Sequence, residues 1–221
     1  MIRDLPPKPG LSFKDGQGRL LHDLASIELQ AMELAVRSLA EYPDAPGEFR
    51  TQLAAISIEE AKHLRLCLEG LEELGRPWGS FPTHSGLWQS VSETDSLLDR
   101  IVIVHRYLEG AGLDATDTIL NRLSGVDAPN VRAIVKVIAI DEIGHVDFGS
   151  RWYREICKQQ GLDPEMDFKP RLYGLIHRIP RRLEKINAAL RAKAGFTPGE
   201  IETLTEVRET LLSKEARIHP V

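Results

Sequence analysis

The sequence has little cysteine and no long apolar segment. Cys67 and Cys157 are the two cysteines among 221 residues, whereas a secreted disulfide scaffold would use more of them in a denser pattern. We therefore expect two reduced thiols in the core of a cytoplasmic protein. No run approaches the roughly 20 apolar residues that cross a bilayer, and the N-terminal residues lack the apolar stretch of a signal peptide. The sequence thus predicts neither secretion nor a membrane partner.

An excess of positive charge is also missing. The formal net charge is -5, which does not favour a polyanion as the main partner. One basic segment covers residues 171–193, and such a run is typical of a solvated face. An anionic partner, tRNA included, is the alternative, but the segment lacks the interleaved aromatic residues that stack on bases. A nucleic-acid partner is therefore not favoured.

Alternation of polar and apolar residues, the pattern of a half-buried strand, is absent as well. Apolar residues instead recur at steps of three and four, which indicates helices. Glycine and proline punctuate them, and Thr197 with Glu200 forms a capping-box pattern at the start of the last one. The expected helices cover about 20–40, 48–74, 87–109, 130–160 and a stretch from 198, with a short one over 114–123. The sequence therefore predicts an all-α fold.

The loop lengths suggest how these helices are connected. Most connections are short, and the longer one lies between the second and third helices, as in a four-helix bundle with one crossover. We expect an irregular lead-in over residues 1–18, the bundle over 19–161, and a helical extension over 162–221 packed on the bundle. With 221 residues, the chain is long enough to bury one large core.

Two short segments carry the same pattern of potential metal ligands. Residues 59–63 read Glu-Glu-Ala-Lys-His and residues 141–145 read Asp-Glu-Ile-Gly-His. Each therefore contains Glu-x-x-His inside an expected helix, with Glu60 and His63 in one and Glu142 and His145 in the other. A spacing of three places the two side chains on one helical face, where they can bind the same ion.

A glutamate precedes each segment at a matching distance. Glu28 lies 32 residues before Glu60, and Glu109 lies 33 residues before Glu142. Glu93 is an alternative to Glu109, but its polar neighbours indicate an exposed position, and the pairing favours Glu109. A single Glu-x-x-His is common on a solvated surface, whereas two with matching upstream glutamates indicate one metal site.

Four carboxylates and two imidazoles suit a pair of divalent ions. The carboxylates neutralise the charge of the ions in a buried site and can bridge them, and oxygen and nitrogen ligands suit iron and manganese. We expect two Fe ions, or an Fe/Mn or Mn/Mn pair. Glu60 and Glu142 would bridge the ions, and the other ligands would be terminal: Glu28, Glu109, His63 and His145.

Several neighbouring residues are candidates to support these ligands. His105 lies one turn before Glu109 and could hydrogen-bond its carboxylate, while Glu59 and Asp141 could each orient the histidine four residues later. Gly144 and Gly149 are unusual inside a helix. They could leave room for dioxygen or substrate, or they could allow close helix packing.

Some stretches of the chain resemble a known family. These are residues 27–34 (IELQAMEL), 81–88 (FPTHSGLW), 141–145 and 194–196 (AGF). They are similar to a bacterial ferritin-like family known mainly as a domain of unknown function, and the likeness covers most of the chain. The tRNA-hydroxylating ferritin-like enzymes are a more distant likeness. The resemblance implies a ferritin-like bundle with C-terminal additions and metal ligands at the six positions already named.

The expected function is therefore an oxidoreductase with a non-haem di-metal centre. It would use dioxygen to oxidise or hydroxylate a small-molecule substrate, with electrons from a donor protein. Iron handling as a ferroxidase, hydroxylation of modified tRNA, and a binding module with a vestigial site are the alternatives. A homodimer is the expected oligomer.

Overall fold

A computed structural model describes residues 7–182 and 184–213, and no strand occurs among them. This confirms the all-α prediction for that part of the chain. The elements, in chain order, are α1 (Lys14–Glu41), α2 (Gly47–Glu73), η2 (Trp88–Ser90), α3 (Leu97–Ile101), η3 (Val102–Glu109), α4 (Gly110–Ser124), α5 (Pro129–Gln159), α6 (Pro164–Leu175), α7 (Ala188–Lys193) and α8 (Pro198–Leu212). The chain divides into two compact units. Among the described residues, the first comprises residues 7–88 and 116–141, and the second comprises residues 89–115, 142–182 and 184–213.

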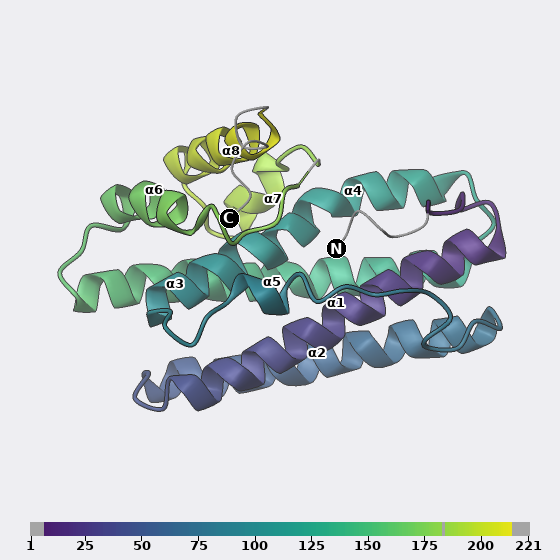
Figure 1. Ribbon diagram of the computed structural model, residues 1–221, viewed down its shortest axis with the longest axis horizontal. Helices are drawn as coiled ribbons and strands as arrows, with labels where there is room; N and C mark the ends of the chain where they lie inside the picture. Colours follow the sequence, from purple (N-terminus) through teal and green to yellow (C-terminus); the bar gives the residue numbers. More distant parts are fainter. Residues whose placement is uncertain (1–6, 183, 214–221) are drawn as a thin grey trace. The chain divides into compact units, whose positions relative to one another are not determined.

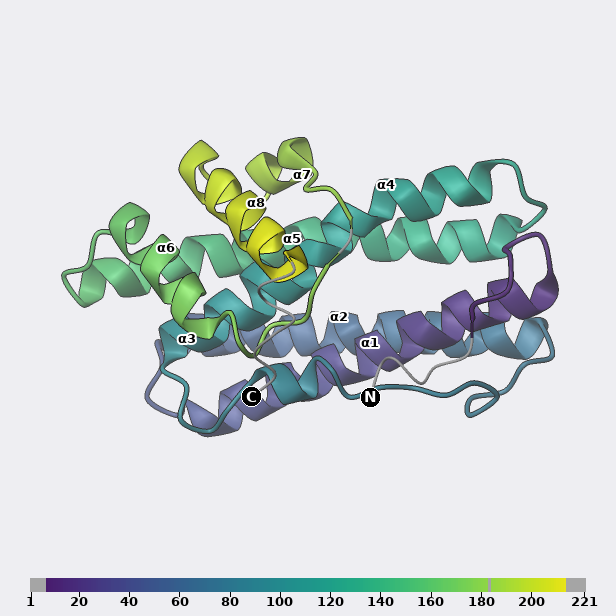
Figure 2. The same cartoon turned by 45° about the horizontal axis from the view of Figure 1, so that its top comes forward.

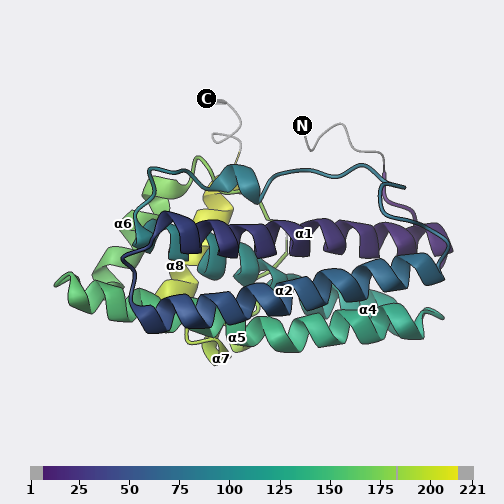
Figure 3. The same ribbon diagram turned by 90° about the horizontal axis from the view of Figure 1, so that it is seen from below.

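The first unit is built on a long helical hairpin. Helices α1 and α2 lie side by side along most of their length, joined by a short turn (Figures 1 and 3). Their apolar faces pack with the parts of α4 and α5 that belong to this unit. The core includes Leu21, Ala25, Cys67, Leu71, Leu123, Val131, Ile134, Val135 and Ile138. Burial of these side chains is the main source of stability for the unit, since apolar burial contributes roughly 25 cal/mol per Å².

Helix α1 begins six residues earlier than the sequence pattern indicated. The preceding segment turns onto the first helical turn, where Phe13 N donates to Gly10 O over 3.1 Å. A Cβ added at Gly16 would lie 2.1 Å from that same oxygen. Glycine at position 16 therefore permits this close backbone approach, and α1 begins before it, at Lys14.

The crossover connection runs back along α1 within the first unit (Figure 1). Gly79 N donates to His22 Nε2 over 3.1 Å, and the Trp78 ring stacks on the His22 ring with centroids 4.5 Å apart. Further along, Gln30 Nε2 donates to His84 O over 3.0 Å. These contacts attach the loop to the buried side of α1, so His22 serves to hold this loop.

The second unit contains α3, η3, the start of α4, the second half of α5, and α6 to α8 (Figure 2). The Arg106 side chain is a fully buried cation in this unit. The Arg106 guanidinium lies 4.3 Å from the Phe196 ring centroid and 4.5 Å from that of Phe168, and its Nη2 lies 2.7 Å from Glu200 Oε2. Aromatic faces and a carboxylate thus compensate the buried charge and join η3 to the C-terminal helices.

The third helix begins ten residues later than expected, at Leu97 instead of about Leu87, and it continues beyond its predicted end. The prediction ended it at Gly110 with a separate short helix over 114–123, but α3, η3 and α4 follow one another without a break from Leu97 to Ser124. Gly110 has an ordinary helical φ of -58°. By contrast, Gly75 and Gly161 follow helices that end as predicted, with φ of +67° and +70°. Glycine ends a helix where the chain adopts a left-handed conformation, and at position 110 it does not.

The last helix begins as the sequence predicted. Thr197 Oγ1 accepts from Glu200 N, and Glu200 Oε2 accepts from Thr197 N, which is a complete capping box. Among the described residues, no helix is long and apolar enough to cross a membrane.

Candidate metal centre

Three predicted ligands converge inside the first unit. Glu28 comes from α1, and Glu60 and His63 come from α2. His63 Nδ1 lies 3.6 Å from Glu28 Oε2 and 3.4 Å from Glu60 Oε2. Each residue offers a ligand atom within 4.8 Å of the others, and all three residues are at most 2% exposed. This spacing matches what one cation needs from three protein ligands.

The local sequence explains why these polar groups point inward. In α2 the buried positions recur at three- and four-residue steps, and they are Leu53, Ile56, Glu60, His63, Cys67, Gly70 and Leu71. Glu60 and His63 thus occupy the apolar stripe of an amphipathic helix. Burying a carboxylate is costly unless a counter-charge compensates it, so the donor set fits a cation.

The opposite nitrogen of His63 is held by a carboxylate. Asp141 Oδ2 lies 3.0 Å from His63 Nε2, and Lys62 Nζ donates to the same oxygen over 2.7 Å. An ionised carboxylate only accepts, so Nε2 carries the proton of this bond, and Nδ1, which faces the two glutamates, is the nitrogen that would lose its proton to a bound cation. A carboxylate behind a ligand histidine fixes its orientation in metal sites. Asp141 was expected to orient His145 in its own helix, but it contacts the histidine of the other segment.

The electrostatics of His63 follow from the same contacts. Burial disfavours a charged ring, but Glu28, Glu60 and Asp141 outweigh it and raise the pKa of His63 to about 10. A proton therefore neutralises part of this carboxylate cluster at pH 7. A bound divalent cation would take over that role and release the proton.

A second set of predicted ligands lies in the second unit. Glu142 and His145 share a face of α5, with His145 Nδ1 3.8 Å from Glu142 Oε1. Glu109 closes η3, and its Oε2 lies 2.8 Å from His105 Nδ1. These side chains are buried, with the Glu109 side chain 8% exposed. His105 thus fixes the Glu109 carboxylate, whereas the alternative Glu93 is exposed in a turn.

The helix that carries Glu109 has an unusual form. Residues 102–109 of η3 form a π-helix, in which each turn holds an extra residue and hydrogen bonds span five residues instead of four. Such stretches are rare and occur frequently at functional sites. The π-helical form could not be predicted from the sequence, because the apolar pattern of this segment is compatible with an ordinary α-helix.

The two glycines of α5, Gly144 and Gly149, have different surroundings. A Cβ at Gly149 would lie 2.5 Å from His105 Cβ, while a Cβ at Gly144 would meet nothing within 4 Å. Gly144 is exposed and Gly149 is buried. Of the two alternatives, close packing therefore describes Gly149, which brings α5 against η3.

The remaining predicted residues lie elsewhere. Glu59 is exposed on α2. In the basic segment, Arg178 Nη1 lies 2.7 Å from Asp95 Oδ1, and Arg191 is fully buried against Asp114. The interpretation of this segment as a solvated face was therefore wrong for Arg191. Sequence reasoning also missed Arg106 and Asp114, because their partners Glu200 and Arg191 lie 94 and 77 residues away in the chain and no local pattern marks them.

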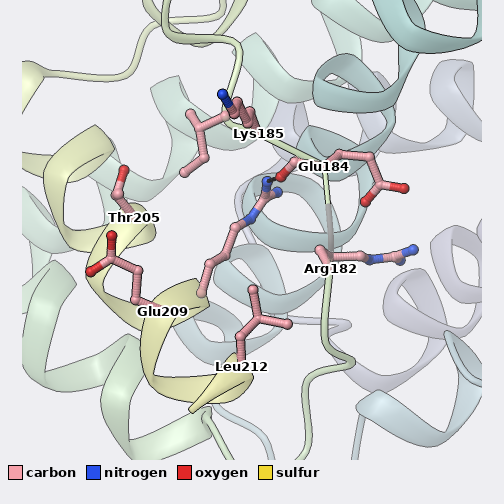
Figure 4. A pocket seen from close by; sticks show the side chains of 8 residues that line it. Arg182, Glu184, Lys185, Thr205, Glu209 and Leu212 are labelled. Atoms are coloured by element: carbon pink, nitrogen blue, oxygen red, sulfur yellow. Dashed lines mark hydrogen bonds between the residues drawn. The ribbon is translucent and has the colours of Figure 1, made fainter.

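A pocket of about 360 Å³ lies in the second unit between α8 and the segment before α7. Arg182, Glu184 and Lys185 line one side, and Thr205, Glu209 and Leu212 line the other (Figure 4). Arg208 also lines it and reaches Asp114 Oδ2 over 2.5 Å. Carboxylates alternate with cations here, so the lining does not single out an anionic ligand.

Comparison with known proteins shows a match to a family of unknown function. A family model described as "Protein of unknown function (DUF455)" matches residues 2–202. An uncharacterized protein of Haemophilus influenzae is 33% identical over 215 residues, which cover 94% of this chain and 74% of that protein. The resemblance seen in the sequence is thus supported as far as a family of unknown function.

Proposed function

This chain belongs to the DUF455 family of proteins of unknown function, and from that premise we propose that it is a non-haem di-metal oxidoreductase. The observation that carries the proposal is the buried group of Glu28, Glu60 and His63 with the carboxylate of Asp141 behind the imidazole. Buried carboxylates around an oriented histidine are the donor set of carboxylate-bridged iron and manganese sites.

The sequence repeat of two Glu-x-x-His segments, each with a glutamate upstream, supports a second set of ligands in the proposal. Glu142 directly follows Asp141 in α5, so one helix supplies both the residue behind His63 and the ligands of the second set. We propose that two ions would be held by these residues, with Glu28 and His63 as ligands of one, Glu109 and His145 as ligands of the other, and Glu60 and Glu142 as the two further carboxylates. This arrangement corresponds to a ferritin-like bundle over residues 19–161, with the extension over 162–221 packed on it.

Two iron ions, or one iron and one manganese, would supply dioxygen activation at this centre. The protein residues contribute charge, orientation and exclusion of water. The carboxylates offset the charge of the ions, His105 and Asp141 hold Glu109 and His63 in place, and the apolar stripe of α2 keeps the first set dry. In a hydroxylation one oxygen atom enters the substrate and the other leaves as water, so a donor must supply two electrons and two protons.

Oxygen uptake by the ferrous protein tests this function. The protein is loaded anaerobically with Fe(II), and its iron content and oxygen consumption are measured for wild type, His63→Ala and Glu59→Ala. We expect about two iron ions per chain and rapid uptake in wild type. We expect His63→Ala to lose both the bound iron and the oxygen uptake. Glu59→Ala should keep both, because it removes only an exposed neighbour.

A wild-type protein that takes up no iron, or a His63→Ala variant that behaves as wild type, contradicts the proposal. Iron retention far beyond two ions per chain in large particles would favour iron storage instead.

A further inference from the structure

The carbonyl oxygen of Arg106 has an unusual donor. In an α-helix this oxygen would accept from the amide of Gly110, but in η3 that amide is directed to the carbonyls of Tyr107 and Leu108. Arg191 Nη1, from α7, donates to Arg106 O over 2.6 Å. A side chain 85 residues away in the chain thus contacts the backbone of the π-helical segment.

Arg191 is anchored so that this contact is directional. Its Nε and Nη2 donate to the two carboxylate oxygens of Asp114 over 3.2 and 2.6 Å. Asp114 lies one turn beyond Gly110 in α4, and Arg208 Nη2 and Asn187 N also donate to it. Arg191 and the Asp114 side chain are fully buried. A planar guanidinium held in a bidentate pair cannot turn freely, so its third nitrogen stays at the Arg106 carbonyl.

Gly110 leaves the space that the guanidinium occupies. A Cβ at this position would lie 2.0 Å from Arg191 Nη1 and 2.5 Å from its Cζ. Any other residue would force the guanidinium away from the carbonyl. Gly112, two residues later, has nothing within 4 Å of its added Cβ. The requirement for glycine is therefore specific to position 110.

We propose that Arg191 is a positioning residue for the second metal ion. Arg191 holds η3 in its π-helical form by donating to the Arg106 carbonyl. Arg106 directly follows His105 and precedes the turn that ends at Glu109. The His105–Glu109 pair, with Oε2 2.8 Å from Nδ1, is thereby set in place. The inference rests on the proposed function, because Glu109 matters to metal binding only if it is a ligand.

Two glycine variants of the full-length protein test this role. Gly110→Ala adds a methyl group that displaces Arg191, and Gly112→Ala adds the same group to open space in the same helix. Amide hydrogen exchange of peptides covering residues 102–115 is measured without metal, and the affinity for the first and second Mn(II) ion is measured separately. Arg191→Lys serves as a further variant, because it keeps the charge beside Asp114 but loses the bidentate geometry.

We expect Gly110→Ala to exchange at least tenfold faster over residues 102–109, with unchanged exchange in α1 and α2. The Gly110→Ala variant should bind the first Mn(II) ion normally and the second at least tenfold more weakly. Arg191→Lys should change the second affinity in the same direction. Gly112→Ala should bind both ions like wild type. A wild type that binds two ions alongside a Gly110→Ala variant that also binds both normally would overturn the positioning role alone. A wild type that binds no metal would overturn the proposed function together with this inference.

Discussion

At the scale of single residues, the His63 imidazole lies between two proposed ligand carboxylates on one side and a third carboxylate on the other. Its Nδ1 faces Glu28 and Glu60, and its Nε2 contacts Asp141. The ring is fully buried, so its orientation is fixed by these three groups. The spacing of Glu60 and His63 could be predicted from the sequence because it is a property of one helix. The contact with Asp141 could not, because it joins residues 78 positions apart.

Replacing Asp141 by asparagine tests whether this carboxylate orients a ligand. Removing the charged acceptor behind a ligand histidine typically lowers metal affinity by about 10–100-fold, and we expect that loss in Asp141→Asn with the fold intact. Lys62→Met is the control, because it removes only a half-exposed ion pair to the same carboxylate and such pairs contribute little. Competition with a chelator for Mn(II) measures the affinity, and an Asp141→Asn variant with wild-type affinity would contradict the assignment.

At the scale of helices, the sequence predicted those whose ends depend on local residues. Helix α2 ends near Gly75, α5 ends near Gly161, and α8 begins at the capping box of Thr197 and Glu200. The prediction failed at Gly110, where a distant arginine occupies the space beside the glycine. It also could not identify η3 as a π-helix, because the apolar periodicity of a short segment does not distinguish the two forms.

The two glycines of α5 give a matched test of helix packing. We expect Gly149→Ala to lower the free energy of unfolding by about 1–3 kcal/mol, because the methyl group would meet His105 Cβ at 2.5 Å. Gly144→Ala should instead raise it by about 0.5–1 kcal/mol, because alanine favours the helix and the position is open. Urea unfolding followed by circular dichroism measures both, and equal effects of the two substitutions would refute the packing argument.

At the scale of the whole molecule, the second unit depends on a buried network of charges. Asp114 accepts from Arg191 and Arg208, and both arginines are at most 5% exposed. Burial alone would raise the pKa of Asp114, but its hydrogen bonds to Arg191 and the charges of both arginines hold that pKa below the usual 3.8. Sequence reasoning could not find this network, since it assembles residues from three separate helices.

This network predicts how stability depends on pH. Because the folded pKa of Asp114 is depressed, its contribution is present above pH 3.8 and is lost as the pH falls below that value through the folded pKa. Asp114→Asn should cost about 3–5 kcal/mol at pH 7, because it leaves two buried arginines without their counter-charge. Urea unfolding at pH 7 and pH 3 should show the difference between wild type and variant shrink at the lower pH. A difference that stays constant would contradict the assignment.

The measurement that tests the central claim most directly is Mössbauer spectroscopy of the protein loaded with ⁵⁷Fe and exposed to air, together with its iron content. The proposed two-metal centre predicts about two iron ions per chain, with their spins coupled. Iron ions without coupling would show two separate sites instead of one centre. A protein without bound iron would contradict the account as a whole.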